Sequence, residues 1–201
     1  MPDFITEGIP PELRQLDQWV CWRLEPKADK DGKPKNTKVP YCAVDGTRAS
    51  STDPHTWTSY AIASRAARER GFNGVGFILT DKDPYVGIDL DNAVDENGEI
   101  RPEQAAILRE LNSYTELSQS GKGLHVIVRG GTPNGEPVKK GDAFGPGQGL
   151  EIYFQKRFWV MTGKRLESFP ENIEDRTSQV ETLFRRFKPA IEDPEDFPDI
   201  L

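Results

Sequence analysis

The sequence has few of the side chains that bind soft metals. It contains two cysteines, Cys21 and Cys42, which are not arranged as CxxC, and two histidines, His55 and His125. A structural zinc site normally takes four Cys and His ligands at close, regular spacing. This shortage argues against zinc and predicts that any metal is a hard cation held by oxygen atoms.

Long hydrophobic runs are absent as well. Hydrophobic residues make up 35% of the 201 residues and charged residues 29%. No apolar run is long enough to span a bilayer, and the first residues, MPDFITEGIPPELRQL, have neither the basic start nor the apolar centre of a signal peptide. We therefore expect a compact globular domain with no membrane partner and a cytoplasmic location.

An excess of positive charge is also missing. The net charge of −7 opposes nucleic-acid binding, because proteins that neutralise phosphates usually carry an excess of Lys and Arg. However, the acidic residues concentrate in two stretches, 81–99 and 188–201, and the rest of the chain is slightly basic. The overall charge therefore does not exclude a nucleic-acid partner.

The patterns that are present mix strands with helices. Strands are expected over 19–25, 74–80, 85–91, 113–117, 124–129, 150–154 and 157–163, because these runs are rich in β-branched and aromatic residues. Helices are expected over 11–17, 53–70, 102–112 and 178–187, the second with Asp53 as N-cap and Pro54 at its first position. The pattern predicts one α/β or α+β domain over 1–187.

Three further expectations concern the rest of the chain. The acidic tail 188–201 is interpreted as a linker or disordered end, with a partner-binding peptide as the alternative. The basic segment 26–38 is expected to be a solvated hairpin connection. Trp19, Trp22 and Trp57 are expected in the core rather than as base-stacking platforms.

The alternation of side chains along a strand predicts on which face each residue of GIDLDN, residues 87–92, lies. In the strand over 85–91, Val86, Ile88 and Leu90 share the core face, so Gly87, Asp89 and Asp91 lie on the other face, where the glycine would leave room for a ligand.

The same alternation in the strands over 124–129 and 150–154 places His125, Ile127, Arg129, Glu151 and Tyr153 outside. If these strands share one sheet, a single face gathers Asp89, Asp91, Glu151 and His125. Carboxylates that close repel one another unless a cation intervenes, and Mg²⁺ or Mn²⁺ is the natural choice for oxygen ligands. Two such ions about 3.5 to 4 Å apart commonly move phosphoryl groups between oxygens.

The loop SQSGKG, residues 118–123, is suited to phosphate. It is not a Walker A loop, because Gly123 follows Lys122 where Ser or Thr is needed. Gly121 and Gly123 could still bring backbone N–H groups to a phosphate, with Lys122 and the serines assisting. GPGQG, residues 145–149, is expected to be a flexible loop, because a strand and not a helix follows it.

In order and spacing, GIDLDN, SGKGLH and LEIY followed by RFWVMTG resemble the catalytic motifs of the archaeo-eukaryotic primase superfamily. The resemblance is closest to the primase-polymerase domains of phages and plasmids and covers roughly residues 15 to 165. It implies an RRM-like catalytic sheet with an N-terminal α/β module. It also implies template-directed nucleotidyl transfer by a DNA primase and/or polymerase that replicates a phage, plasmid or other mobile element.

The resemblance also assigns roles to residues. It implies that Asp89, Asp91 and Glu151 bind two divalent metals, Mg²⁺ or Mn²⁺, and that His125 contacts the phosphates of the incoming nucleotide, assisted by Ser120, Lys122 and Gly123. Many members have Ser-x-His, whereas Gly123 stands two positions before His125 here. Arg157, Thr162 and Gly163 match a segment that would contact nucleotide or template.

The expected partners are a DNA template, single-stranded or primed, and NTPs or dNTPs, with a helicase domain or protein as a further partner. The basic residues expected to contact DNA phosphates are Arg48, Arg129, Lys139, Lys140 and Lys156.

Taken without the resemblance, the residues indicate only metal-dependent phosphoryl or nucleotidyl transfer. A nuclease is therefore one alternative, and a non-catalytic DNA-binding module on the same scaffold is another. The sequence leaves open whether the domain starts chains de novo or only extends primers. It also leaves open whether ribo- or deoxyribonucleotides are used, and the candidate contacts to the sugar are Asn92, Tyr153 and Phe158.

Overall fold

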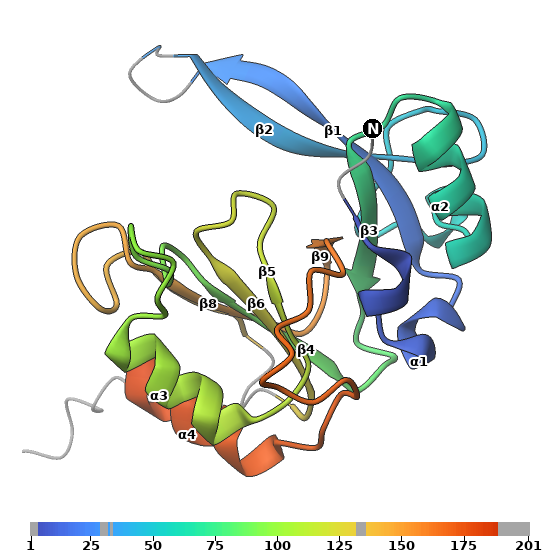
Figure 1. Ribbon diagram of the computed structural model, residues 1–201. Coiled ribbons are helices and arrows are strands. Elements are labelled where there is room, and N and C mark those ends of the chain that lie inside the picture. The colour runs from blue at the N-terminus through green and yellow to red at the C-terminus, as the bar shows by residue number, and fades with distance from the viewer. Residues whose placement is uncertain (1–3, 29–31, 33, 132–135, 189–201) are drawn as a thin grey trace, which may run out of the picture.

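The computed structural model describes residues 4–28, 32, 34–131 and 136–188. Within these residues the chain forms two antiparallel sheets, one with strand order β2-β1-β3-β9 and one with order β5-β6-β4-β8-β7 (Figure 1). We call them the first and the second sheet. The strands are β1 (Trp19–Ala28), β2 (Pro34–Tyr41), β3 (Gly74–Leu79), β4 (Tyr85–Leu90), β5 (Thr115–Leu117), β6 (Leu124–Arg129), β7 (Val138–Lys140), β8 (Leu150–Tyr153) and β9 (Arg157–Met161).

Helices cover the outer side of each sheet. The α-helices are α1 (Pro11–Arg14), α2 (Tyr60–Glu69), α3 (Pro102–Leu111) and α4 (Thr177–Phe187), and the 3-10 helices are η1 (Thr6–Gly8) and η2 (Pro54–Thr56). Helix α2 packs on β1 and β3 of the first sheet, whereas α3 and α4 lie together under the second sheet (Figure 1).

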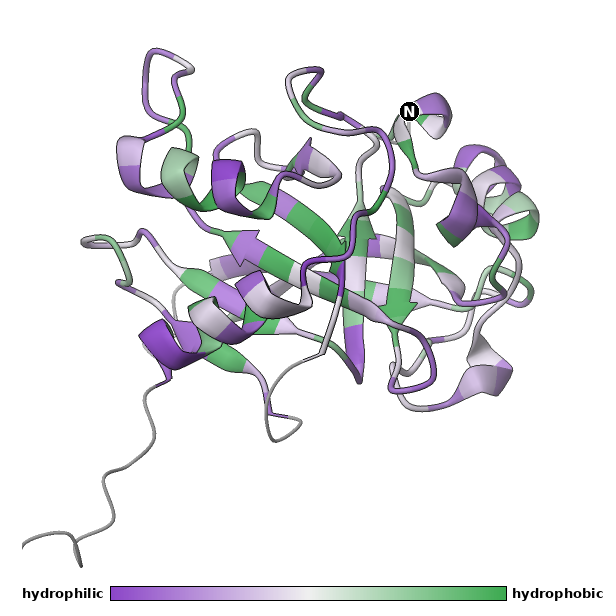
Figure 2. Cartoon of the chain, turned by 90° about the horizontal axis from the view of Figure 1, so that it is seen from below, coloured by the Kyte–Doolittle hydropathy of each residue, from purple (hydrophilic) through white to green (hydrophobic). Residues whose placement is uncertain are grey.

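Alternation along β4 builds the core between the second sheet and its two helices. Val86, Ile88 and Leu90 are fully buried there with Ile107 of α3 and Leu183 of α4, among other apolar residues. In Figure 2 the hydrophobic residues concentrate on the strands, while much of the loop and outer helix surface is hydrophilic. The core face predicted for residues 86, 88 and 90 is thereby confirmed.

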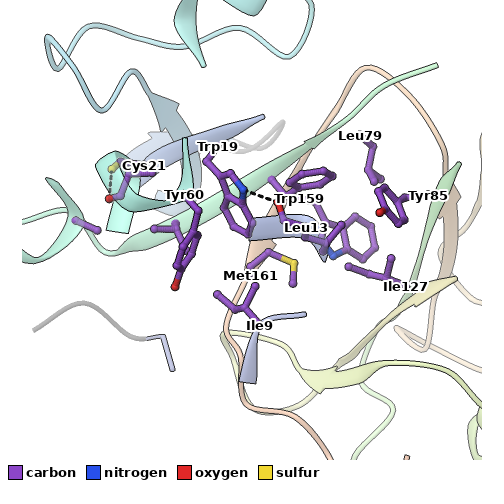
Figure 3. Packing of buried hydrophobic residues seen from close by; sticks show 14 of the residues in the cluster. Ile9, Leu13, Trp19, Cys21, Tyr60, Leu79, Tyr85, Ile127, Trp159 and Met161 are labelled. Carbon is purple, nitrogen blue, oxygen red and sulfur yellow. Dashed lines mark hydrogen bonds between the residues drawn. The ribbon is translucent and has the colours of Figure 1, made fainter. Parts of the chain in front are cut away.

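The opposite face of the second sheet is also largely covered, because it packs on the first sheet. Trp159 of β9 lies between the two sheets, in one cluster of buried residues with Tyr85 and Ile127 of the second sheet and with the core residues of the first (Figure 3). Ile127 is fully buried although strand alternation predicted it outside. The alternation itself was right, but both faces of this sheet carry a core.

Gly87 has a different role from the predicted one. A Cβ built on Gly87 would lie 2.8 Å from the Trp159 ring. The missing side chain thus leaves room for a tryptophan of the neighbouring sheet, not for a ligand, and it lets the two sheets approach.

The predicted elements of the N-terminal half need correction. The helix predicted over 53–70 is two elements: Asp53 caps η2, Trp57 to Ser59 are extended, and α2 begins only at Tyr60. An antiparallel bridge between Trp19 and Thr58 causes the break, because it ties residue 58 to the edge of β1. The helix predicted over 11–17 ends at Arg14.

Two strands were not predicted. The hairpin predicted around 26–38 is confirmed, but β1 and β2 extend far into it and pair from Cys21 and Tyr41 out to Ala28 and Pro34. Strand β7 pairs with β8 at the edge of the second sheet. Strand β2 is rich in Lys and Pro, and β7 consists of Val138 and two exposed lysines, so neither shows the apolar alternation that marks a strand.

The α+β class predicted from the sequence is confirmed, while the RRM-like assignment of the second sheet stays a prediction. The prediction of a linker or disordered end over 188–201 falls almost wholly on residues 189–201, which lie outside the described residues. In the described part of the chain, no helix combines the length and the apolar character needed to cross a membrane.

Candidate active site

The second sheet places the predicted polar residues side by side. Strand β4 is central, and Asp89 pairs in register with His125 of β6 on one side and with Glu151 of β8 on the other. Residues directly opposite in neighbouring strands project from the same face. The sequence prediction that these three residues share one face is therefore confirmed.

Asp91 follows directly after β4 and completes the group. Its carboxylate is close enough to Gly149 that a Cβ there would lie 3.0 Å from Asp91 Oδ2. Partial burial raises the pKa of Asp91, and the negative charges of Asp89 and Glu151 raise it further. The three carboxylates thus repel one another, which is the situation that a cation relieves.

The oxygen-rich set fits a hard divalent cation, but Glu151 would have to turn to join it. Glu151 Oε2 accepts hydrogen bonds from the Tyr153 hydroxyl at 2.5 Å and from Arg157 at 3.3 Å. As these side chains stand, no three His, Cys, Asp or Glu residues of the described ranges converge closely enough to enclose an ion. Among the described contacts, neither Asp89 nor Asp91 accepts a side-chain hydrogen bond, so Glu151 is the member of the set whose carboxylate is already engaged.

His125 is held by a buried carboxylate that the sequence analysis did not single out. Glu116 of β5 is fully buried, and its Oε1 lies 3.2 Å from His125 Nδ1. This contact orients the imidazole so that Nε2 faces Asp89, 4.0 Å from Oδ1. Burial alone would lower the pKa of His125, but the hydrogen bond to Glu116 and the charges of Asp89 and Glu116 raise it above its ordinary value.

Thr162 and Gly163 belong to the support of this histidine. Their backbone N–H groups donate to Glu116 at 3.0 and 2.7 Å, and the fully buried Thr162 hydroxyl donates to the Leu117 carbonyl. Tyr114 completes the set with a 2.6 Å hydrogen bond from its hydroxyl. Of the three predicted nucleotide or template contacts, the structure thus places Thr162 and Gly163 behind His125, whereas Arg157 lines the cavity described next.

A cavity of about 470 Å³ opens beside Asp89 and His125, between the two sheets. Three cationic side chains line it: Lys38 from β2, Lys156 from the turn after β8, and Arg157 from β9. Arg157 is stacked on the Tyr153 ring, with the guanidinium carbon 4.1 Å from the ring centre. The combination of acidic and basic walls suits a ligand that carries both phosphates and a metal.

Lys38 is the cavity residue that sequence reasoning missed. Desolvation lowers the pKa of its amine, although Asp89 and Asp91 act in the opposite direction. The residue lies in KVPY, inside the segment interpreted as a loop. The available signal in the sequence was the apolar Val39 and Tyr41 alternating with Lys38 and Pro40.

The backbone amides of the SQSGKG loop donate hydrogen bonds within the loop itself. The Gly121 N–H donates to the Ser118 carbonyl, the Gly123 N–H to the Ser118 hydroxyl and the Lys122 N–H to the Ser120 hydroxyl. In this structure these amides therefore form no open phosphate cradle, contrary to the expectation. Ser120 and Lys122 are exposed and do not line the cavity.

The other predicted basic contacts are scattered. Lys139 pairs with Glu151 in register and its amine lies 5.3 Å from the Tyr153 ring centre, so it stands beside the site, and Lys140 is its neighbour opposite Leu150. Arg48 is paired with Glu25 of the hairpin. Arg129 is paired with Glu12 at 2.7 Å and also donates to the Ile173 carbonyl, so it ties α1 to the second sheet.

Comparison with known proteins supports the resemblance. No protein-family model matches the chain. The chain is 41% identical over 153 residues to a protein named "DNA Primase-polymerase" from Nitratiruptor phage NrS-1. The aligned part is 76% of this chain but 20% of that protein, so the chain spans about a fifth of its relative. Across about three quarters of the chain, this similarity confirms the resemblance to phage primase-polymerases that the motifs predicted.

Proposed function

We propose that this chain is the catalytic domain of a DNA primase and/or polymerase that acts in the replication of a phage or related element. One observation carries the proposal: Asp89 lies between His125 and Glu151 in strand register, beside a cavity with cationic walls. The similarity to the phage primase-polymerase supports it. A DNA template and nucleoside triphosphates are the corresponding partners, and a helicase stays a prediction from the resemblance.

In this proposal Asp89, Asp91 and Glu151 hold two divalent ions, Mg²⁺ or Mn²⁺. Such ions, when bound, would favour the attack of a 3′-hydroxyl on the α-phosphate and stabilise the departing pyrophosphate. The chain's own residues would bind the triphosphate. Lys38 and Arg157 would neutralise its charge, with Arg157 exchanging Glu151 for a phosphate oxygen.

His125 would donate a hydrogen bond to a phosphate through Nε2. Because Glu116 occupies Nδ1, the ring is oriented before substrate binds and loses little freedom on binding. The cavity between the sheets would hold the nucleotide with its phosphates toward Asp89.

A template-directed incorporation assay tests the proposal. The protein, with Mg²⁺ or Mn²⁺, labelled nucleotides and a template, should form extended product, and Asp89→Asn should lower the rate at least about a hundredfold. Glu103→Gln, an equivalent change at an exposed position of α3, should leave the rate unchanged. Reactions with and without primer, and with ribo- or deoxyribonucleotides, define the activity.

Two results would contradict the proposal. Degradation of the template without incorporation would identify a nuclease. Salt-dependent DNA binding that is indifferent to Glu151→Gln, with no incorporation under either metal, would identify a non-catalytic DNA-binding module.

A further inference from the structure

A second cavity lies next to the one that contains Asp89. It has a volume of about 410 Å³, within the range of cavities that hold small ligands, and it shares Ser51 and Lys156 with its neighbour. The Ser51 hydroxyl donates to the Lys156 carbonyl at 3.1 Å. These two residues therefore form a common wall, and a ligand in the second cavity would be adjacent to one in the first.

Trp57 gives this cavity an aromatic wall. All four tryptophans lie within the described residues, and Trp19, Trp22 and Trp159 are at most 3% exposed, whereas Trp57 is half-buried. The prediction that Trp57 is a core residue like Trp19 and Trp22 was therefore wrong. Pro54 and Leu79 add apolar surface beside it. A partly exposed indole ring with apolar neighbours suits a flat aromatic ligand.

The Trp57 ring is fixed before any ligand binds. Its Nε1 donates to the Ser50 carbonyl at 2.6 Å, and the Thr56 hydroxyl accepts from Ser50 N and donates toward the Ser50 and Asp53 carbonyls. The Asp53 side chain caps the following turn. A platform held in this way costs little entropy on binding.

The charges of the cavity favour a base over a phosphate inside it. Asp17 and Asp81 line it and would repel a phosphate, while they can accept hydrogen bonds from base N–H groups. Lys82 and Lys156 also line it and can neutralise the sugar-phosphate chain at its borders. Lys156 is held in a left-handed backbone conformation, φ +52°, which is uncommon for a residue other than glycine and is often found at functional sites.

We propose that this cavity binds an unpaired base of a single-stranded nucleic acid, stacked on Trp57, directly beside the nucleotide cavity. Stacking on an aromatic side chain with cations along the backbone is the usual chemistry of single-strand binding. Binding of the base does not depend on the proposed function. Only the identification of the bound strand as the template rests on it.

Tryptophan fluorescence tests the proposal without metal or catalysis. Titration with an oligodeoxythymidylate of about ten nucleotides should quench the emission, because Trp57 is the tryptophan that solvent reaches. Trp57→Phe should abolish the quenching while the oligonucleotide still binds. Free dTTP, titrated to the same thymine concentration, should quench much less.

Anisotropy of a labelled oligonucleotide measures the affinity itself. Trp57→Ala should weaken binding about tenfold to a hundredfold, and Trp57→Phe should restore most of it. Lys82→Glu, at an exposed position, provides a variant that does not depend on the packing of Trp57. Its matched control is Arg185→Glu on α4, which should weaken binding less.

The proposal is overturned if the oligonucleotide binds wild type without quenching it, or if folded Trp57→Ala and Lys82→Glu bind as tightly as wild type. Equal quenching by dTTP would also overturn it and would assign the cavity to a free nucleotide. The incorporation assay separates failure of this proposal from failure of the proposed function. A protein that incorporates nucleotides but shows no Trp57-dependent binding lacks only the base site. A protein that shows Trp57-dependent binding but no incorporation contradicts only the proposed polymerase function.

Discussion

Glu116 shows how much of the candidate site depends on a residue that cannot reach a substrate. Its buried carboxylate receives hydrogen bonds from the Tyr114 hydroxyl and from the Thr162 and Gly163 amides, and it contacts His125. The backbone at residues 162 and 163 is thereby fixed to the histidine. In the sequence its signal was a carboxylate inside the strand-like run SYTEL, residues 113–117, which was interpreted as strand pattern alone.

Substitution of Glu116 should be costly for the whole fold. Glu116→Ala leaves several buried donors without an acceptor, so we expect the free energy of unfolding to fall by about 3 kcal/mol or more. Glu116→Gln keeps one acceptor and should cost less. Urea denaturation measures both, with the exposed Glu110→Ala as a control that should change stability by less than about 0.5 kcal/mol. A loss as small as that of the control would contradict the structural role.

The buried thiol of Cys21 gives a second prediction at this scale. Burial raises its pKa to about 12, and its Sγ donates to the Ala63 carbonyl at 3.3 Å. Because the thiolate is the reactive form, Cys21 should resist alkylation by iodoacetamide at neutral pH in the native state and react in urea. Mass spectrometry of the alkylated peptides measures this, and rapid native labelling of Cys21 would disprove the burial.

Among the elements, β4 was the one that sequence reasoning described best. Strict apolar alternation fixed the face of Val86, Ile88 and Leu90, and the same rule brought Asp89 together with His125 and Glu151. The weak elements were β2 and β7, since exposed hairpin and edge strands need no apolar face. Lys38 was missed for this reason, because its importance comes from its place in the wall of the cavity that also contains Asp89, and not from its neighbours in sequence.

The close approach of β4 and β9 can be tested at Gly87. A side chain there would collide with the Trp159 ring, so Gly87→Ala should destabilise the protein by about 1 to 3 kcal/mol. Gly141→Ala is a suitable control, because a Cβ at Gly141 meets nothing within 4 Å. Thermal denaturation compares the two, and equal melting temperatures would show that the two sheets separate without penalty.

At the scale of the whole molecule, the repulsion among Asp89, Asp91 and Glu151 should make the stability of the fold depend on a bound metal ion. Saturating Mn²⁺ or Mg²⁺ should raise the melting temperature, since a ligand present at a hundred times its dissociation constant adds about 2.7 kcal/mol. EDTA should reverse the increase. Asp89→Asn should abolish it, whereas Glu103→Gln should preserve it, and a shift of equal size in Asp89→Asn would place the ion elsewhere.

The path from β8 to β9 has a mechanical consequence. Within a few residues the chain carries Glu151 on the second sheet, turns at Lys156, and enters the first sheet at Arg157. The second sheet and the Lys156–Arg157 part of the cavity wall are therefore joined by one short covalent segment, and the sheets cannot move apart at this point without displacing Glu151. The short connection thus limits how far the two sheets can separate beside the cavity.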